Sequence, residues 1–122
     1  MNAMDAKSFA AGFAAWAAAI PIVKVAGEYT ADGATGKLLM MGSVGLGIAF
    51  ATTPLLSAIL GWRTREQRVR GIAIALGVAQ TIDGVVHLLY PSFYSSNPSV
   101  ALSAAGHIFF GAGALGILSA FS

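Results

Sequence analysis

Apolar residues occupy four long runs of the chain, and short polar segments separate them. A membrane-spanning helix needs about 20 mostly apolar residues, and each run reaches that length. The pattern therefore predicts an all-α, polytopic membrane protein that forms one domain over residues 1–122. The four antiparallel transmembrane helices are expected at about residues 8–28, 38–60, 67–90 and 99–121.

Composition supports the membrane assignment, because 57% of the residues are hydrophobic and only 10% are charged. A soluble domain of 122 residues needs more charged side chains to cover its surface. The chain has no cysteine, which excludes disulfides, thiol catalysis and iron–sulfur ligation. The first apolar run resembles a signal peptide, but its length and low leucine content favour a retained helix.

Positive charge is concentrated between the second and third runs, in Arg63, Arg65, Arg68 and Arg70. Such clusters mark cytoplasmic loops, so we expect an inner-membrane protein with both termini in the cytoplasm. Because membrane topology explains the arginines, we expect no nucleic-acid partner. The residues expected at the membrane interfaces are these four arginines and three aromatic residues: Trp62, Tyr90 and Tyr94.

One stretch of the third run, residues 79–87, breaks the apolar pattern. Asp83 and His87 are four residues apart and share one helical face, and Gln80 precedes Asp83 by about one turn. Ionisable groups inside a membrane are expensive, so they are expected to have a partner or a function.

Depth along the helices predicts which polar groups meet. Asp83 precedes Tyr90 by roughly 10 Å of helix, and His107 follows Ser99 by roughly 12 Å. If Tyr90 and Ser99 bracket one turn, Asp83 and His107 face each other. We therefore predict one polar cluster in the outer half of the bundle, as a ligand or proton site. Its expected members are Asp83, His87, His107, Gln80, Lys24 and Glu28, and the last pair has the i, i+4 spacing of an ion pair or of side chains that reach the membrane edge.

Three interpretations of this cluster remain open. In the first, Asp83 bonds His107 or Lys24 and only fixes helix register. In the second, the groups line an outward-opening cavity in which a carboxylate exchanges protons with a cationic substrate. In the third, His87, His107 and Asp83 bind a metal or a haem, or act as acid and base, because two histidines and a carboxylate can form a metal site. No cofactor is assigned, since no HxxxH or ExxH pair accompanies them.

Small residues predict close helix contacts, for example the four-residue repeat Ala10, Ala14 and Ala18. In length and helix number the chain resembles the small multidrug transporters. Those proteins carry an essential acid in their first span, whereas the deepest acid here is Asp83 in the third, so the resemblance assigns no residue a role.

We expect a small integral inner-membrane protein that acts as a binding or accessory subunit. It would contact membrane lipid and form a homo-oligomer or join a larger membrane complex. The alternatives are a proton-coupled transporter of small cationic or amphipathic molecules and a haem- or metal-binding redox subunit. An enzyme is the less expected outcome.

Overall fold

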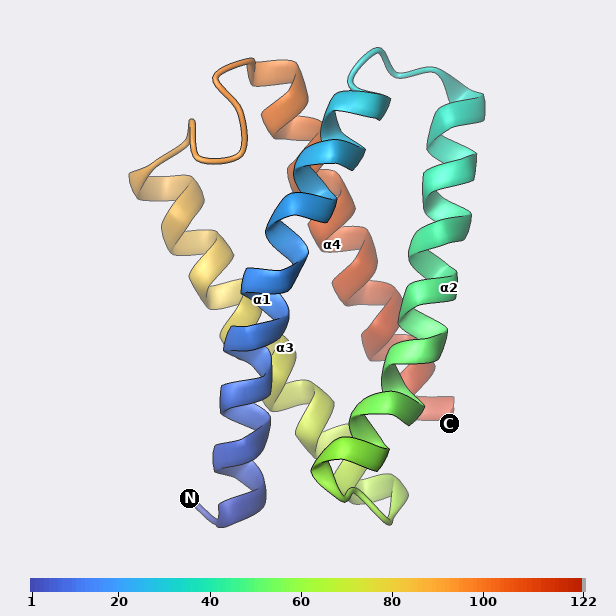
Figure 1. The fold of residues 1–122 in the computed structure, drawn as a ribbon, viewed down its shortest axis with the longest axis vertical. Helices are drawn as coiled ribbons and strands as arrows, with labels where there is room; N and C mark the ends of the chain where they lie inside the picture. Colours follow the sequence, from blue (N-terminus) through green and yellow to red (C-terminus); the bar gives the residue numbers. More distant parts are fainter. Residues whose placement is uncertain (122) are drawn as a thin grey trace.

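The computed structural model describes residues 1–121, which form four α-helices and no strand (Figure 1). The helices are α1 (Ala3–Thr30), α2 (Thr35–Leu60), α3 (Arg65–Leu89) and α4 (Pro98–Phe121). Each contains an 18-residue window with a mean hydropathy of 1.7 and is long enough to cross a membrane. The predicted all-α, four-helix membrane architecture is confirmed. The bounds agree within a few residues, except that α1 begins at Ala3 rather than near residue 8.

Local sequence explains where the helices begin and end. The side chain of Asn2 accepts a hydrogen bond from the backbone N–H of Asp5 at 2.8 Å, and this cap extends α1 beyond its apolar run. Thr64 and Gln67 form a complete capping box at the start of α3. Gly61 ends α2 with a φ of 74°, a left-handed conformation that glycine adopts without a steric penalty.

Helix α1 is the centre of the bundle. It packs mainly against α3 and α4, whereas α2 packs mainly against α4 (Figure 1). Two glycines on α1 allow close approach: a Cβ at Gly12 would lie 2.8 Å from the Ala75 Cα, and one at Gly27 would lie 2.9 Å from the Val100 carbonyl oxygen. Ala10, Ala14 and Ala18 are all exposed, so the close helix contact predicted for this stripe is not made within the bundle and stays a prediction for a partner chain.

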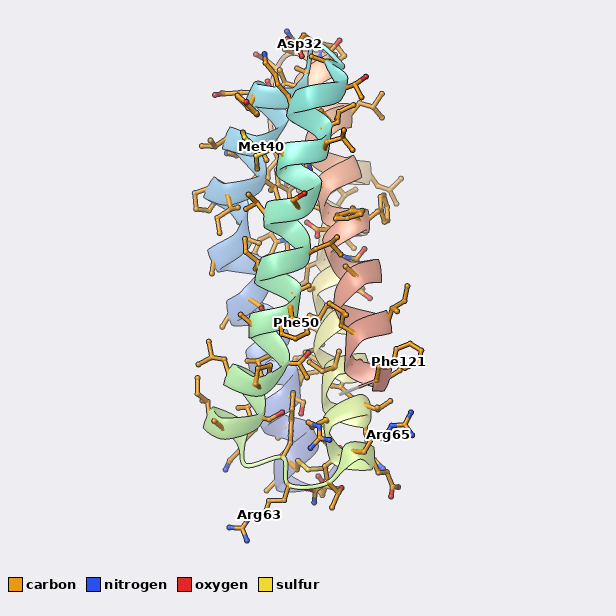
Figure 2. All side chains as sticks on the ribbon, turned by 90° about the vertical axis from the view of Figure 1, so that its right-hand side faces the viewer. Asp32, Met40, Phe50, Arg63, Arg65 and Phe121 are labelled. Atoms are coloured by element: carbon orange, nitrogen blue, oxygen red, sulfur yellow. The ribbon has the colours of Figure 1, made fainter. Side chains whose placement is uncertain are left out.

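The two ends of the bundle differ in charge. Arg63 and Arg65 lie at one end and Asp32 at the other, with Phe50 on α2 between them (Figure 2). At the arginine end, which we define as residues 61–70 with the adjoining ends of α1 and α4, Arg70 binds buried Asp5 through two hydrogen bonds of 2.9 and 2.8 Å. Arg65 donates to the Ala120 carbonyl near the end of α4. Charged groups therefore tie α3 to both neighbouring helices at this end.

Candidate functional site

The carboxylate of Asp83 is buried and lies between α1, α3 and the loop that follows α3. Trp16 Nε1 on α1 donates to Asp83 Oδ1 at 2.8 Å. Tyr94 in the loop donates its hydroxyl to the same oxygen. Both donors are neutral, so the carboxylate is held by hydrogen bonds rather than by an ion pair. Asp83 thus links α3 to α1, which is distant in sequence, and to the loop that directly follows α3.

Aromatic rings surround these hydrogen bonds. Phe93 stacks on Trp16 with 6.4 Å between ring centroids, and its edge meets Tyr94 at 5.2 Å. His87 stacks on Tyr94 at 4.9 Å. We call Trp16, Asp83, His87, Phe93 and Tyr94 the Asp83 cluster. Burial raises the pKa of the Tyr94 hydroxyl, and its hydrogen bond to Asp83 raises it further, so Tyr94 stays protonated as a donor.

Hydrogen bonding fixes the tautomer of His87. Its Nδ1 lies 2.8 Å from the backbone carbonyl oxygen of Asp83, which can only accept, so Nδ1 carries the proton. In the neutral ring, Nε2 is then an acceptor. This nitrogen is buried and has no hydrogen-bond partner within the described residues 1–121.

Lys24 is placed next to the Asp83 cluster. Its ammonium group lies 4.9 Å from the centroid of the Phe93 ring, a cation–π contact. The predicted alternative of a Lys24–Glu28 ion pair is wrong, because the ion pairs within residues 1–121 are Lys37–Asp32 and Arg70–Asp5. Glu28 is exposed, and Gln80 is half-buried beside the cluster without a hydrogen bond to another described residue.

A second polar cluster lies where the ends of α1 and α4 meet. Thr30 Oγ1 is 2.7 Å from the Ala26 carbonyl, 2.6 Å from Ser103 Oγ and 2.7 Å from His107 Nε2. The carbonyl only accepts, so the single Thr30 proton goes to it, and Ser103 and His107 must donate to Thr30. His107 therefore carries a proton on Nε2. We call Thr30, Ser103 and His107 the Thr30 cluster.

The prediction that Asp83 faces His107 is wrong. The two side chains meet α1 at Trp16 and Thr30, positions that are about 21 Å apart along a helix. The prediction was wrong because it assumed that the end of α3 and the start of α4 lie at the same depth along the bundle. In Figure 1 the end of α3 lies well below the start of α4, and the connecting loop climbs between them.

Sequence reasoning missed most partners of the polar groups. Trp16, Phe93, Thr30 and Ser103 were not among the expected site residues, and the hydrogen-bond donors of Trp16 and Thr30 are the one signal that could have pointed to them. Tyr94 was expected at a membrane interface, but it is only 5% exposed and turns into the bundle. Trp62, also expected there, is 3% exposed and packs its ring on Gly71. Tyr90 does remain exposed.

The proposed metal site does not form from these residues. His107 bonds Thr30, whereas Asp83 bonds Trp16 and Tyr94, so the polar groups of His107 and Asp83 do not meet. Among residues 1–121 there is no group of three His, Cys, Asp or Glu side chains placed to hold a metal ion. The hypothesis of a site made by Asp83, His87 and His107 together is therefore wrong, as is an acid–base pair of the two histidines.

Comparison with known proteins gives no relative: no family model, curated protein or solved structure matches the chain. The function must therefore be argued from the geometry alone.

Proposed function

We propose that this small integral membrane protein is an accessory subunit of an inner-membrane assembly, either of its own copies or with other chains. Its contact surface with the partner is the outward face of α3. The observation that carries the proposal is an open stripe of small residues on that face, beside a shallow apolar groove.

The stripe consists of Ala73, Gly77 and Gly84, all of which are exposed. A Cβ added at Gly77 or Gly84 would meet no atom of residues 1–121 within 4 Å, so no described residue uses the close approach that these glycines offer. Membrane helices associate through such small residues, because backbones can then pack directly. The stripe thus suits a helix from another chain.

A groove of about 380 Å³ runs beside the stripe, between α1 and α3. Phe9 and Phe13 of α1 form one wall and are each about half exposed. Gly77 and Ile82 of α3 lie on the other side. A partner helix could pack its backbone against the stripe. Its side chains would then enter this groove.

The Asp83 cluster has a positioning role in this proposal. Asp83 directly precedes Gly84, and its hydrogen bond from Trp16 fixes the rotation of α3 against α1. The rotation decides which α3 residues face outward. The polar centre expected to bind a ligand is thus proposed to orient the contact surface.

Single-cysteine cross-linking tests the proposal, because the natural chain has no cysteine. Gly77→Cys and Gly84→Cys should cross-link to a neighbouring chain in native membranes with a short bifunctional thiol reagent. Gly47→Cys is the matched control, since that α2 position is equally open. Mass spectrometry of the native complex then identifies the partner as a second copy or as another protein.

Gly77→Leu should dissociate the assembly, while Gly47→Leu should leave it intact. Equal cross-linking at positions 47 and 77, or a single chain as the largest species in native membranes, would refute the accessory role.

A second candidate, proton-coupled transport of small cationic or amphipathic molecules, is favoured by one detail of Asp83. Trp16 and Tyr94 both donate to Oδ1, and Oδ2 receives no hydrogen bond from a described residue. Oδ2 can therefore take up a proton without breaking the cluster. If transport occurs, substrate addition in detergent should release protons from the natural chain but not from Asp83→Asn. Equal release from both would exclude Asp83 as the coupling group.

A further inference from the structure

A second groove lies at the arginine end, on the opposite side of the bundle from the α3 stripe. Its volume is about 400 Å³, and it is lined by Phe50, Thr53, Pro54, Ser57, Arg68 and Leu118. Residues of α2 and α4 make its apolar part, and Arg68 of α3 stands at its polar end. The groove is therefore amphipathic, with an apolar length and a cationic end.

One polar group in the groove lacks a partner. Thr53 is only 2% exposed, and its Oγ1 is buried without a hydrogen bond within residues 1–121. By contrast, the neighbouring Ser57 hydroxyl donates to the Thr53 carbonyl at 2.7 Å. A buried hydroxyl without a partner costs free energy, so a bound group that pairs with Thr53 would relieve that cost.

Pro54 removes a helical hydrogen bond beside Thr53. Proline has no backbone N–H, so the Phe50 carbonyl four residues earlier loses its normal helical donor. The Thr52 hydroxyl does not replace it, because it donates to the Ile48 carbonyl at 2.7 Å. The proline turn of α2 therefore offers both an unpaired hydroxyl and an acceptor that lacks its helical donor.

Charge identifies the kind of occupant. Residues 63–70 contain four arginines and one glutamate. The partly buried Arg68 has five N–H donors in a planar fork, so it can bind phosphate oxygens alongside other contacts. The exposed arginines Arg63 and Arg65 lie at the same end (Figure 2). An anionic headgroup is thus favoured over a zwitterionic one.

We propose that the groove between α2, α3 and α4 binds one anionic phospholipid, with its phosphate on Arg68, a headgroup or glycerol oxygen on Thr53, and an acyl chain along Phe50 and Leu118. The observations that carry the proposal are the amphipathic groove, the unpaired buried hydroxyl and the positive charge at its end. It does not depend on the accessory role, which uses a different surface.

Native mass spectrometry of the purified full chain tests it, with phosphatidylglycerol and phosphatidylcholine of identical acyl chains as probes. The natural chain should retain one phosphatidylglycerol molecule in preference to phosphatidylcholine. Arg68→Gln should weaken retention about fivefold, the usual value of one basic residue near an anionic lipid. Thr53→Val, which keeps the side-chain shape, should weaken retention about threefold through loss of one hydrogen bond.

Arg63→Gln is the matched control, because it removes an exposed positive charge at the same end. Equal losses from Arg63→Gln and Arg68→Gln would show general charge attraction and overturn the site. Equal retention of the two lipids, or a second copy of the chain in the groove, would also overturn it. If Arg68→Gln does not fold, Thr53→Val decides: unchanged retention in that variant contradicts the proposal.

Discussion

Helices α1 and α2 have the same peak hydropathy but very different places in the bundle. Both contain an 18-residue window of mean hydropathy 1.7 and one internal proline. Yet seven residues of α1 are buried, against two of α2, Ala49 and Thr53. Hydropathy therefore identifies a membrane helix but does not say whether other helices surround it.

Polar side chains make the difference. Helix α1 is bonded to its neighbours at three levels: Asp5 to Arg70, Trp16 to Asp83, and Thr30 to Ser103 and His107. The levels are about 16 and 21 Å apart along the helix. Three hydroxyls of α2, those of Ser43, Thr52 and Ser57, instead bond carbonyls of their own helix. Bonds between helices thus distinguish the central helix from the peripheral one.

The glycines repeat this contrast. Gly12 and Gly27 of α1 press against backbone atoms of other helices. On α2, Gly47 faces open space, and Gly42 and Gly45 meet only the flexible ring of Phe110. The same residue type therefore permits backbone packing in α1 and leaves room in α2.

Gly12→Leu should have the largest effect on stability of the changes that test the contrast between α1 and α2. The new side chain would overlap the backbone of Ala75, which cannot move without displacing α3. We expect a loss of about 3 kcal/mol in the free energy of unfolding, measured by titration from mild detergent into SDS. Gly47→Leu on α2 is the control and should change stability little. A small loss at Gly12 would mean that α1 and α3 are not in tight contact.

Asp83→Leu should have the next largest effect. It leaves the Trp16 N–H and the Tyr94 hydroxyl buried without an acceptor, at a cost of about 2 kcal/mol in the free energy of unfolding. Asp83→Asn keeps a carbonyl acceptor and should lose less. Trp16 fluorescence should shift in both variants, and an unchanged spectrum in Asp83→Leu would contradict the hydrogen bond.

Thr30→Val should lower the free energy of unfolding by about 1 kcal/mol, a typical value for hydrogen bonds between membrane helices. The matched variant Thr52→Val on α2 removes a hydroxyl that bonds only within its own helix and should cost less. Nitrogen NMR of labelled His107 gives an independent reading. A proton on Nε2 in the neutral ring is expected, and the opposite tautomer would refute the assigned direction of the bond.

The sequence predicts the helices well because membrane spans depend on local apolar length, and local caps such as Thr64 with Gln67 are visible as motifs. It also identifies Asp83 and His107 as residues that need partners. It does not predict which residues bond to Asp83 and His107. The loop over residues 90–97 runs along the bundle from the end of α3 to the start of α4 and places Tyr94 inside it. No local sequence pattern predicts this course of the loop. Trp16 and Thr30 become partners only because α1 crosses both α3 and α4.

The smallest expected effect concerns the exposed contact that ties the start of α2 to the loop before it. Lys37 donates to Asp32 at 2.7 Å, and this bond, followed by one from the Ala34 N–H, holds the pKa of the Asp32 carboxyl below its ordinary value of 3.8. A lowered folded-state pKa means that the contribution to stability is present above that ordinary value and is lost as pH falls through the folded-state pKa. Asp32→Asn should therefore lower the melting temperature slightly at neutral pH, and the difference should vanish in acid. Lys37→Gln should raise the Asp32 pKa in an NMR titration. A difference in melting temperature that persists unchanged in acid would show that the ion pair contributes nothing, and α2 would then be even less restrained relative to α1.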